Sequence, residues 1–143
     1  MGRTVQVVID CADPAALSRF WAQALDYVLQ PPPDGHDSWE SWLAAMGVPE
    51  SEWNSASAVI DPEGRGPRVY FQRVPEAKVA KNRLHLDLRA SDWRSPVEER
   101  RRAIEPEADR LVALGATVVG PVEERGEVWV VLRDPEGNEF CVT

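Results

Sequence analysis

His85 is the residue of this sequence whose type and position best suit acid–base chemistry. It lies in Leu84–Ala90, where apolar and polar residues alternate as in a half-buried strand. The alternation places His85, Asp87 and Arg89 on one face, and it predicts that the intervening leucines pack under a helix. Histidine titrates near pH 6.5 when unperturbed, so His85 could act as a general base beside a carbonyl. The structural alternative is a hydrogen-bonded histidine next to an Asp87–Arg89 ion pair that braces the sheet.

Cys141 is a second side chain that could do chemistry. The chain has two cysteines, Cys11 and Cys141, without the paired CxxC spacing of a structural zinc module, and we expect both to be reduced. As a nucleophile, Cys141 would need an activating base, which His85 could supply if the fold brings the two together. The alternative role of Cys141 is that of a small buried hydrophobic residue.

The tryptophans point to the character of a ligand. Trp39, Trp42 and Trp53 make up half of the six tryptophans and lie within 15 residues of one another. Aromatic walls with a few polar groups are typical of a small-molecule pocket for a planar or apolar ligand. The alternative is that this segment caps the open end of a sheet as ordinary core or forms a dimer contact.

The elements that position these residues follow from local signals. Asp13 and Pro14 form a helix start directly after a strand, and apolar residues then recur at helical spacing. Leu114 and Gly115 mark the end of a second long helix, which we expect to be interrupted or restarted at Glu105–Pro106. The predicted strands are 5–11, 27–29, 56–60, 68–74, 84–90, 116–119, 128–132 and 139–143, and the predicted helices are 13–26, 39–46 and 95–114.

The order of elements repeats, and so does one tetrapeptide. Asp-Pro-Glu-Gly occurs at Asp61–Gly64 and at Asp134–Gly137, each time between the last two strands of a half. The sequence therefore predicts a duplicated half-domain, with modules at 1–75 and 83–143 joined by a polar connector at 76–82.

Composition limits the partners. The chain of 143 residues is 43% hydrophobic and 28% charged, as in one ordinary globular domain, and has no apolar run near the roughly 20 residues of a membrane helix. A formal charge of −8 opposes nucleic-acid binding. Residues 1–4 lead into a strand without an apolar leader, so we expect no signal peptide and a cytoplasmic location.

Several motifs together resemble a known superfamily. They are Val8–Pro14 leading into Phe20–Leu25, Asn82–Leu88, Leu114–Thr117 and Asp134–Phe140. In order and spacing they resemble the vicinal oxygen chelate superfamily, which includes glyoxalase I, bleomycin-resistance proteins and extradiol dioxygenases, and most of all its glyoxalase-like branch. The resemblance implies an α+β fold of two βαβββ modules whose curled sheets enclose a shared cavity, within one chain or across a homodimer.

The resemblance also implies where a metal would bind. Family members place a ligand seven residues before the helix-capping Asp of each module, which corresponds to Gln6 and His85. A glutamate normally lies four residues after the Gly of the closing turn, where this chain has Cys141, and apolar register puts Gln72 at the matching position of the first module. With two amides and no carboxylate there, we expect a metal-free pocket, although His85 and Cys141 suit zinc or copper.

These considerations predict a homodimeric small-molecule-binding protein with a degenerate pocket and no cofactor. Its ligand-facing residues would come from the predicted inner strand faces and the tryptophans. Whether it catalyses a reaction stays open. The alternatives are a metal-dependent lyase or isomerase with His85 as a catalytic residue, and a sequestering resistance protein for a cationic drug, which the acidic charge would suit. The predicted ligand-facing residues are Gln6, Asp10, Trp39, Trp42, Trp53, Tyr70, Gln72, His85, Asp87, Arg89, Trp129 and Cys141.

Overall fold

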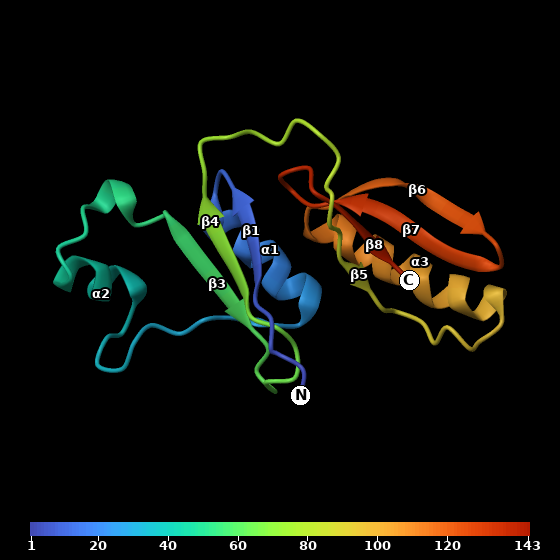
Figure 1. Cartoon of the computed structure of the whole chain (residues 1–143), viewed down its shortest axis with the longest axis horizontal. Coiled ribbons are helices and arrows are strands. Elements are labelled where there is room, and N and C mark those ends of the chain that lie inside the picture. The colour runs from blue at the N-terminus through green and yellow to red at the C-terminus, as the bar shows by residue number, and fades with distance from the viewer. The chain divides into compact units, whose positions relative to one another are not determined.

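The computed structural model describes residues 1–143, which form eight strands, three α-helices and one short 3-10 helix (Figure 1). The chain divides into two compact units, Met1–Ala77 and Lys78–Thr143. None of the helices combines the length and apolar character that a membrane span requires.

The first unit is built on one four-stranded sheet with strand order β1-β4-β3-β2. Strands β1 and β4 run parallel, and the other neighbours are antiparallel. The elements are β1 (Val7–Cys11), α1 (Pro14–Leu25), β2 (Val28–Leu29), α2 (Trp39–Ala45), the 3-10 helix (Glu50–Glu52), β3 (Ala56–Ile60) and β4 (Val69–Arg73).

The second unit repeats this topology with strand order β5-β8-β7-β6, in which β5 and β8 are the parallel pair. Its elements are β5 (Asp87–Leu88), α3 (Val97–Leu114), β6 (Thr117–Glu124), β7 (Glu127–Arg133) and β8 (Glu139–Val142). The predicted α+β class with two βαβββ modules is therefore confirmed.

Helix α1 packs on the first sheet through the apolar stripe predicted from the sequence. Asp13 caps the helix by accepting the Ala16 N–H at 3.1 Å, and Pro14 occupies the first turn, where its missing N–H costs nothing. Leu17 and Trp21 are buried on its inner side, and Val59 and Phe71 of the sheet are fully buried.

Both Asp-Pro-Glu-Gly segments form the same turn. In the second copy, Asp134 accepts the N–H of Glu136 at 2.9 Å, and Gly137 takes a left-handed backbone with φ of 86°. In the first copy, Asp61 accepts the N–H of Glu63 at 2.8 Å. An aspartate that bonds the backbone two residues later fixes the turn, and glycine tolerates its positive φ.

The predicted interruption of the second long helix is wrong. Helix α3 runs without a break from Val97 to Leu114 and includes Pro106. Pro106 is exposed, so the carbonyl that loses its partner can be solvated, while Ile104, Ala108 and Leu111 are buried on the opposite side. Burial of this apolar side offsets the cost of about 3 kcal/mol for proline in a helix interior.

The strand predicted at Leu84–Ala90 is shorter in the structure. Strand β8 begins only at Glu139, after the turn, and its ladder bonds reach back to the carbonyl of Leu86, which accepts the Cys141 N–H at 2.9 Å. The backbone ladder between these two strands starts at this Leu86 carbonyl, and the residues before it are not part of β5. Leu84 is 71% exposed, so the prediction that it packs under a helix is wrong, and Leu86 and Leu88 are half-buried.

Strand β6 is longer than predicted. It continues past Val119 to Glu124, because a bulge between Val118 and Gly120 lets the pairing with β7 resume. Gly120 has a φ of 157°, a conformation that other residues seldom adopt. The long β6–β7 hairpin extends the sheet well beyond the predicted core strands.

Candidate functional site

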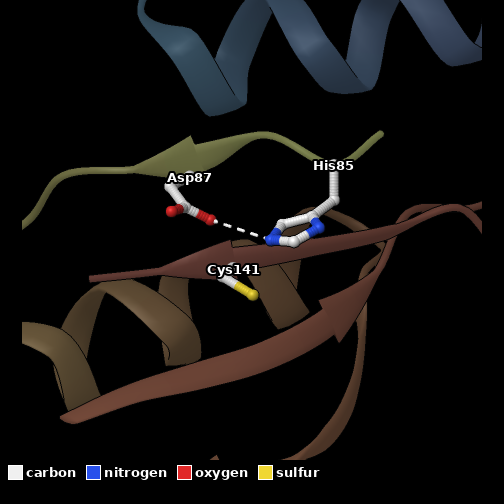
Figure 2. Close-up of side chains that lie close together, drawn as sticks. All are labelled: His85, Asp87 and Cys141. Atoms are coloured by element: carbon white, nitrogen blue, oxygen red, sulfur yellow. Dashed lines mark ion pairs between the residues drawn. The ribbon is translucent and has the colours of Figure 1, made fainter. Parts of the chain in front are cut away.

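Three side chains of the second unit that can bind a metal or move a proton lie close together (Figure 2). The parallel register of β5 and β8 sets Asp87 opposite Cys141, and His85 lies two residues before Asp87 on the same side. One ligand atom from each of His85, Asp87 and Cys141 lies within 4.8 Å of the other two. His85 Nε2 is 3.5 Å from an Asp87 carboxylate oxygen.

This arrangement differs from the expected Asp87–Arg89 ion pair. Asp87 pairs with His85 instead, while Arg89 is exposed after the end of β5. The side chains of His85 and Asp87 are 45% and 51% exposed, so their ion pair is screened and contributes little to stability. It can still fix the orientation of the imidazole.

The surroundings of Cys141 disfavour its thiolate form. Burial raises its pKa, and the negative charge of Asp87 raises it further, while Lys81 acts weakly in the opposite direction. No hydrogen bond joins the Cys141 sulfur to His85, although the two belong to the same cluster. A nucleophilic thiolate is therefore disfavoured unless a cation displaces the proton.

The donor types of the cluster fit zinc. Imidazole nitrogen, carboxylate oxygen and thiolate sulfur are the zinc ligands of proteins, and three protein ligands are the usual number in a catalytic site. Tetrahedral zinc separates its ligand atoms by about 3.3–3.8 Å, so a group within 4.8 Å needs only a small adjustment. Asp87 is the third ligand that was missing when only His85 and Cys141 were considered.

The two glutamines of the predicted ligand set do not face each other in the first unit. Gln6 lies beside Arg68 and accepts its Nη1–H at 2.8 Å, whereas Gln72 pairs in register with Asp10, four residues further along β1. Four strand residues span about 13 Å. The two alignments, Gln6 with His85 and Gln72 with Cys141, are therefore inconsistent with each other. Apolar register within β4 could not reveal this, because it does not fix how β4 pairs with β1.

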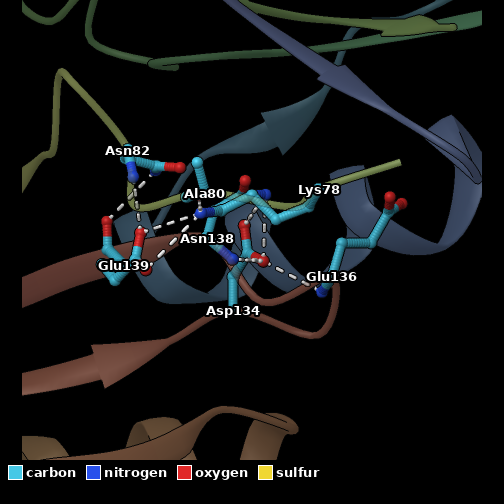
Figure 3. Close-up of polar contacts among 7 residues, drawn as sticks. All are labelled: Lys78, Ala80, Asn82, Asp134, Glu136, Asn138 and Glu139. Atoms are coloured by element: carbon cyan, nitrogen blue, oxygen red, sulfur yellow. Dashed lines mark hydrogen bonds and ion pairs between the residues drawn. The ribbon is translucent and has the colours of Figure 1, made fainter. Parts of the chain in front are cut away.

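Glu139 shares the face of Cys141 but does not join the cluster. Its carboxylate accepts the backbone N–H of Asn82 at 2.9 Å and lies 3.2 Å from Lys78 Nζ (Figure 3). The Asn82 bond and, to a lesser degree, Lys78 lower the pKa of Glu139 to about 2. Glu139 thus holds the segment before β5 against the start of β8.

Trp129 belongs to the same open face of the second sheet. It alternates with the buried Val128 and Val130 of β7, and its neighbour on that face, Val131, pairs with Cys141. Trp129 is half-buried there. The sheet register therefore puts an aromatic ring on the face that carries His85, Asp87 and Cys141.

The first unit holds a cavity of about 640 Å³ beside the free half of β3. Strand β2 pairs with Val59 and Ile60, and Gln30 after it donates its N–H to the Ala58 carbonyl at 2.9 Å. Beyond that point Ala56 and Ser57 line the cavity together with residues of the segment that contains α2. Four of the predicted ligand-facing residues line this cavity: Trp39, Trp42, Trp53 and Tyr70.

Hydrogen bonds at both ends hold the aromatic wall in place. Trp39 donates its indole N–H to the Gln30 carbonyl at 2.7 Å, and its ring meets that of Trp42 edge to face at 5.7 Å between centroids. At the other end, Trp53 donates to the Val48 carbonyl at 2.9 Å. Asn54 accepts the Ala15 N–H at 2.8 Å, which ties the segment to α1. A wall fixed in this way is largely formed before a ligand arrives.

The cavity also contains polar residues that the sequence analysis missed. Arg68 and Gln30 line it, and Arg68 Nε donates to Gln30 Oε1 at 2.7 Å. Arg68 lies two residues before Tyr70 and therefore shares its face, so strand alternation could have identified it. Gln30 follows a two-residue strand and gave no such signal. Of the other predicted residues, Asp10 and Gln72 are exposed on the sheet and do not line the cavity.

Comparisons with known proteins agree with this architecture. A family model described as a glyoxalase-like domain matches residues 6–143. No match was found among curated proteins. The family match confirms the resemblance that the sequence motifs indicated.

Solved structures of low sequence identity share the fold. A glyoxalase/bleomycin resistance protein/dioxygenase family enzyme from Burkholderia phytofirmans has a TM-score of 0.62 at 16% identity, covering 96% of this chain and 94% of that one. The fosfomycin resistance protein FosX from Mesorhizobium loti has a TM-score of 0.58 at 12% identity, covering 99% and 90%. A hypothetical protein from S. aureus has a TM-score of 0.63 at 12% identity, covering 99% and 93%.

We predict that Asp87→Asn makes Cys141 more reactive. Removing the carboxylate charge lowers the pKa of the thiol, so alkylation by iodoacetamide should become roughly three- to tenfold faster below that pKa. The measurement is the pH–rate profile in a Cys11→Ala background, with the exposed Asp109→Asn as the matched control. A profile whose midpoint stays at the same pH would show that Asp87 does not act on the thiol.

We predict that Glu139 makes stability depend on acid pH. Its folded pKa of about 2 lies below the ordinary 4.5, so its contribution is present above pH 4.5 and is lost as the pH falls toward 2. Because solvent screens part of the pair, Glu139→Gln should cost about 1 kcal/mol at neutral pH and flatten the acid limb of the stability curve. Urea unfolding at a series of pH values from neutral to acid measures the loss of stability and its pH dependence. The control Glu105→Gln, at an exposed position, should leave the stability curve unchanged.

Proposed function

Because the chain belongs to the glyoxalase-like domain family, we propose that it binds a planar or apolar small molecule in the aromatic cavity of residues 1–77, without a metal ion in that cavity. The observation that carries the proposal is the convergence of Trp39, Trp42, Trp53 and Tyr70 on one space of about 640 Å³. Ligand pockets for small molecules usually have volumes of about 300–1,000 Å³ and mostly apolar linings.

The cavity's side chains favour binding over chemistry. Its lining includes no histidine or cysteine, so the hydroxyls of Ser18, Ser55 and Ser57 have no imidazole among the lining residues to activate them. Of its carboxylates, Glu52 is paired with Arg73 at 3.1 Å, and Glu40 lies exposed in the first turn of α2. Indole rings offer large, rigid contact surfaces, and aromatic pairs add about 0.5–1.5 kcal/mol beyond area burial. These features suit a protein that holds its ligand without turnover.

We predict that a neutral bicyclic probe such as 2-naphthamide binds this cavity and changes the tryptophan fluorescence. Trp42→Ala should weaken binding about tenfold or more, because it removes one wall and the edge-to-face support of Trp39. Trp93→Ala, in the second unit and 64% exposed in the unmodified chain, is the control and should bind like the wild type. Calorimetry measures the affinity of each protein for the probe. Equal losses of affinity in Trp42→Ala and Trp93→Ala, or no binding to the wild type, would contradict the proposal.

A second candidate function is favoured by the cluster in the second unit. His85, Asp87 and Cys141 would hold a zinc ion, which would supply Lewis-acid polarisation of a carbonyl or activation of a bound water. This is the chemistry that a lyase or isomerase of the glyoxalase type would need. His85 would then be a ligand, so it would not be free to act as the general base.

The second candidate function predicts that the purified or reconstituted protein contains one zinc ion per chain. Zinc should raise the melting temperature, and His85→Ala or Asp87→Ala should abolish both the bound metal and the shift. The chain's other histidine, His36, provides the matched control His36→Ala. Elemental analysis with a thermal-shift assay measures both quantities, and zinc retained by His85→Ala would rule out this cluster as the site.

A further inference from the structure

Arg68 is held in the cavity by three neutral groups. Its Nε donates to Gln30 Oε1 at 2.7 Å, and its Nη1 donates to Gln6 Oε1 at 2.8 Å. Its guanidinium carbon lies 5.2 Å from the centre of the Tyr70 ring. Two hydrogen bonds and a stacking contact fix both the position and the plane of the group.

The charge of Arg68 is not neutralised by the chain. Its hydrogen-bond partners are amide oxygens, and the ion pairs of the structure involve other arginines, such as Arg73 with Glu52. An arginine carries five N–H donors, of which two have partners here. A half-buried cation without a counterion is costly, and that cost is recovered when an anion binds.

We propose that the cavity is selective for aromatic acids, with Arg68 receiving the carboxylate while the tryptophans and Tyr70 contact the ring. The inference rests on the proposed function, because it names the ligand class of the same cavity. A planar guanidinium fork matches a carboxylate in shape and charge, and one such fork suits a single negative charge. Gln6 and Gln30 act as positioning residues, since they hold Arg68 without cancelling its charge.

The acidic character of the whole protein does not oppose this local preference. The net charge of −8 acts at long range, but salt screens exposed charges beyond about 8 Å at physiological ionic strength. Inside a cavity with apolar walls, the nearest fixed charge dominates. The negative surface slows the approach of an anion, so its association rate should rise with added salt.

The test compares two ligands of the same shape, 2-naphthoate and neutral 2-naphthamide, by calorimetry at neutral pH. The wild type should bind naphthoate about 10- to 100-fold more tightly than naphthamide. Arg68→Met should remove that preference, so that the two ligands bind this variant with affinities within about twofold of each other. Arg68→Lys should keep part of the preference, because it retains the charge but loses the fork.

Three further variants keep the test decisive. Gln30→Leu should reduce the preference for naphthoate over naphthamide several-fold, which also serves if Arg68→Met does not fold. Arg65→Met, at an exposed arginine outside the cavity, should change neither affinity. Arg19→Met tests the other arginine of the lining, and it should leave the preference intact.

The outcomes separate the two proposals. Naphthamide binding without any preference for naphthoate would overturn the assignment of aromatic acids and leave the proposed function standing. A preference that survives Arg68→Met or disappears in Arg19→Met would overturn the role of Arg68. Failure of both ligands to bind the wild type would overturn the proposed function itself.

Discussion

The parallel pairing of the first and last strand in each module decides which side chains can act together. In the second unit this pairing sets Asp87 opposite Cys141, and in the first it sets Val8 opposite Tyr70 and brings Gln6 beside Arg68. A shift by one residue would turn each of these side chains to the other face of its sheet. The cluster of His85, Asp87 and Cys141 and the placement of Arg68 beside Gln6 are therefore consequences of strand register, and the helices contribute by burying the opposite faces.

The same topology has produced two different environments. The second unit gathers an imidazole, a carboxylate and a thiol, which are donor types that zinc accepts, and burial and the Asp87 charge raise the pKa of that thiol. The first unit gathers amides, aromatic rings and an arginine that no carboxylate neutralises, a group that attracts an anion. Gln6 shows the divergence most directly. Where the family resemblance implies a metal ligand, its oxygen accepts a hydrogen bond from Arg68.

Much of the fold was predictable because its signals are local. The cap at Asp13 and Pro14 and the repeated Asp-Pro-Glu-Gly turn each depend on residues within five positions of one another. Pro106 misled the prediction because its cost in a helix depends on burial, which the sequence does not state. Leu84 misled it because strand length depends on the partner strand, and the backbone pairing with β8 starts only at the Leu86 carbonyl.

The sites were harder to predict because they depend on contacts between distant residues. Alternation placed His85, Asp87 and Arg89 on one face, but only the pairing with β8 decides that Asp87 meets Cys141 while Arg89 lies past the strand end. The pairing of Gln6 with Arg68 spans 62 residues and could not be deduced from apolar register within β4. The homodimer and the cytoplasmic location stay predictions.

The way Arg68 is held explains why a cavity of this kind is selective. Carboxylates around a guanidinium would already balance its charge, so an anionic ligand would add little. Gln6 and Gln30 instead hold Arg68 in place without balancing its charge. The entropy of ordering the arginine is thus lost during folding and not again on binding. A neutral amide can orient a cation without balancing its charge. With amides at Gln6 and Gln30, the first unit is a preorganised receptor for one negative charge next to an aromatic surface.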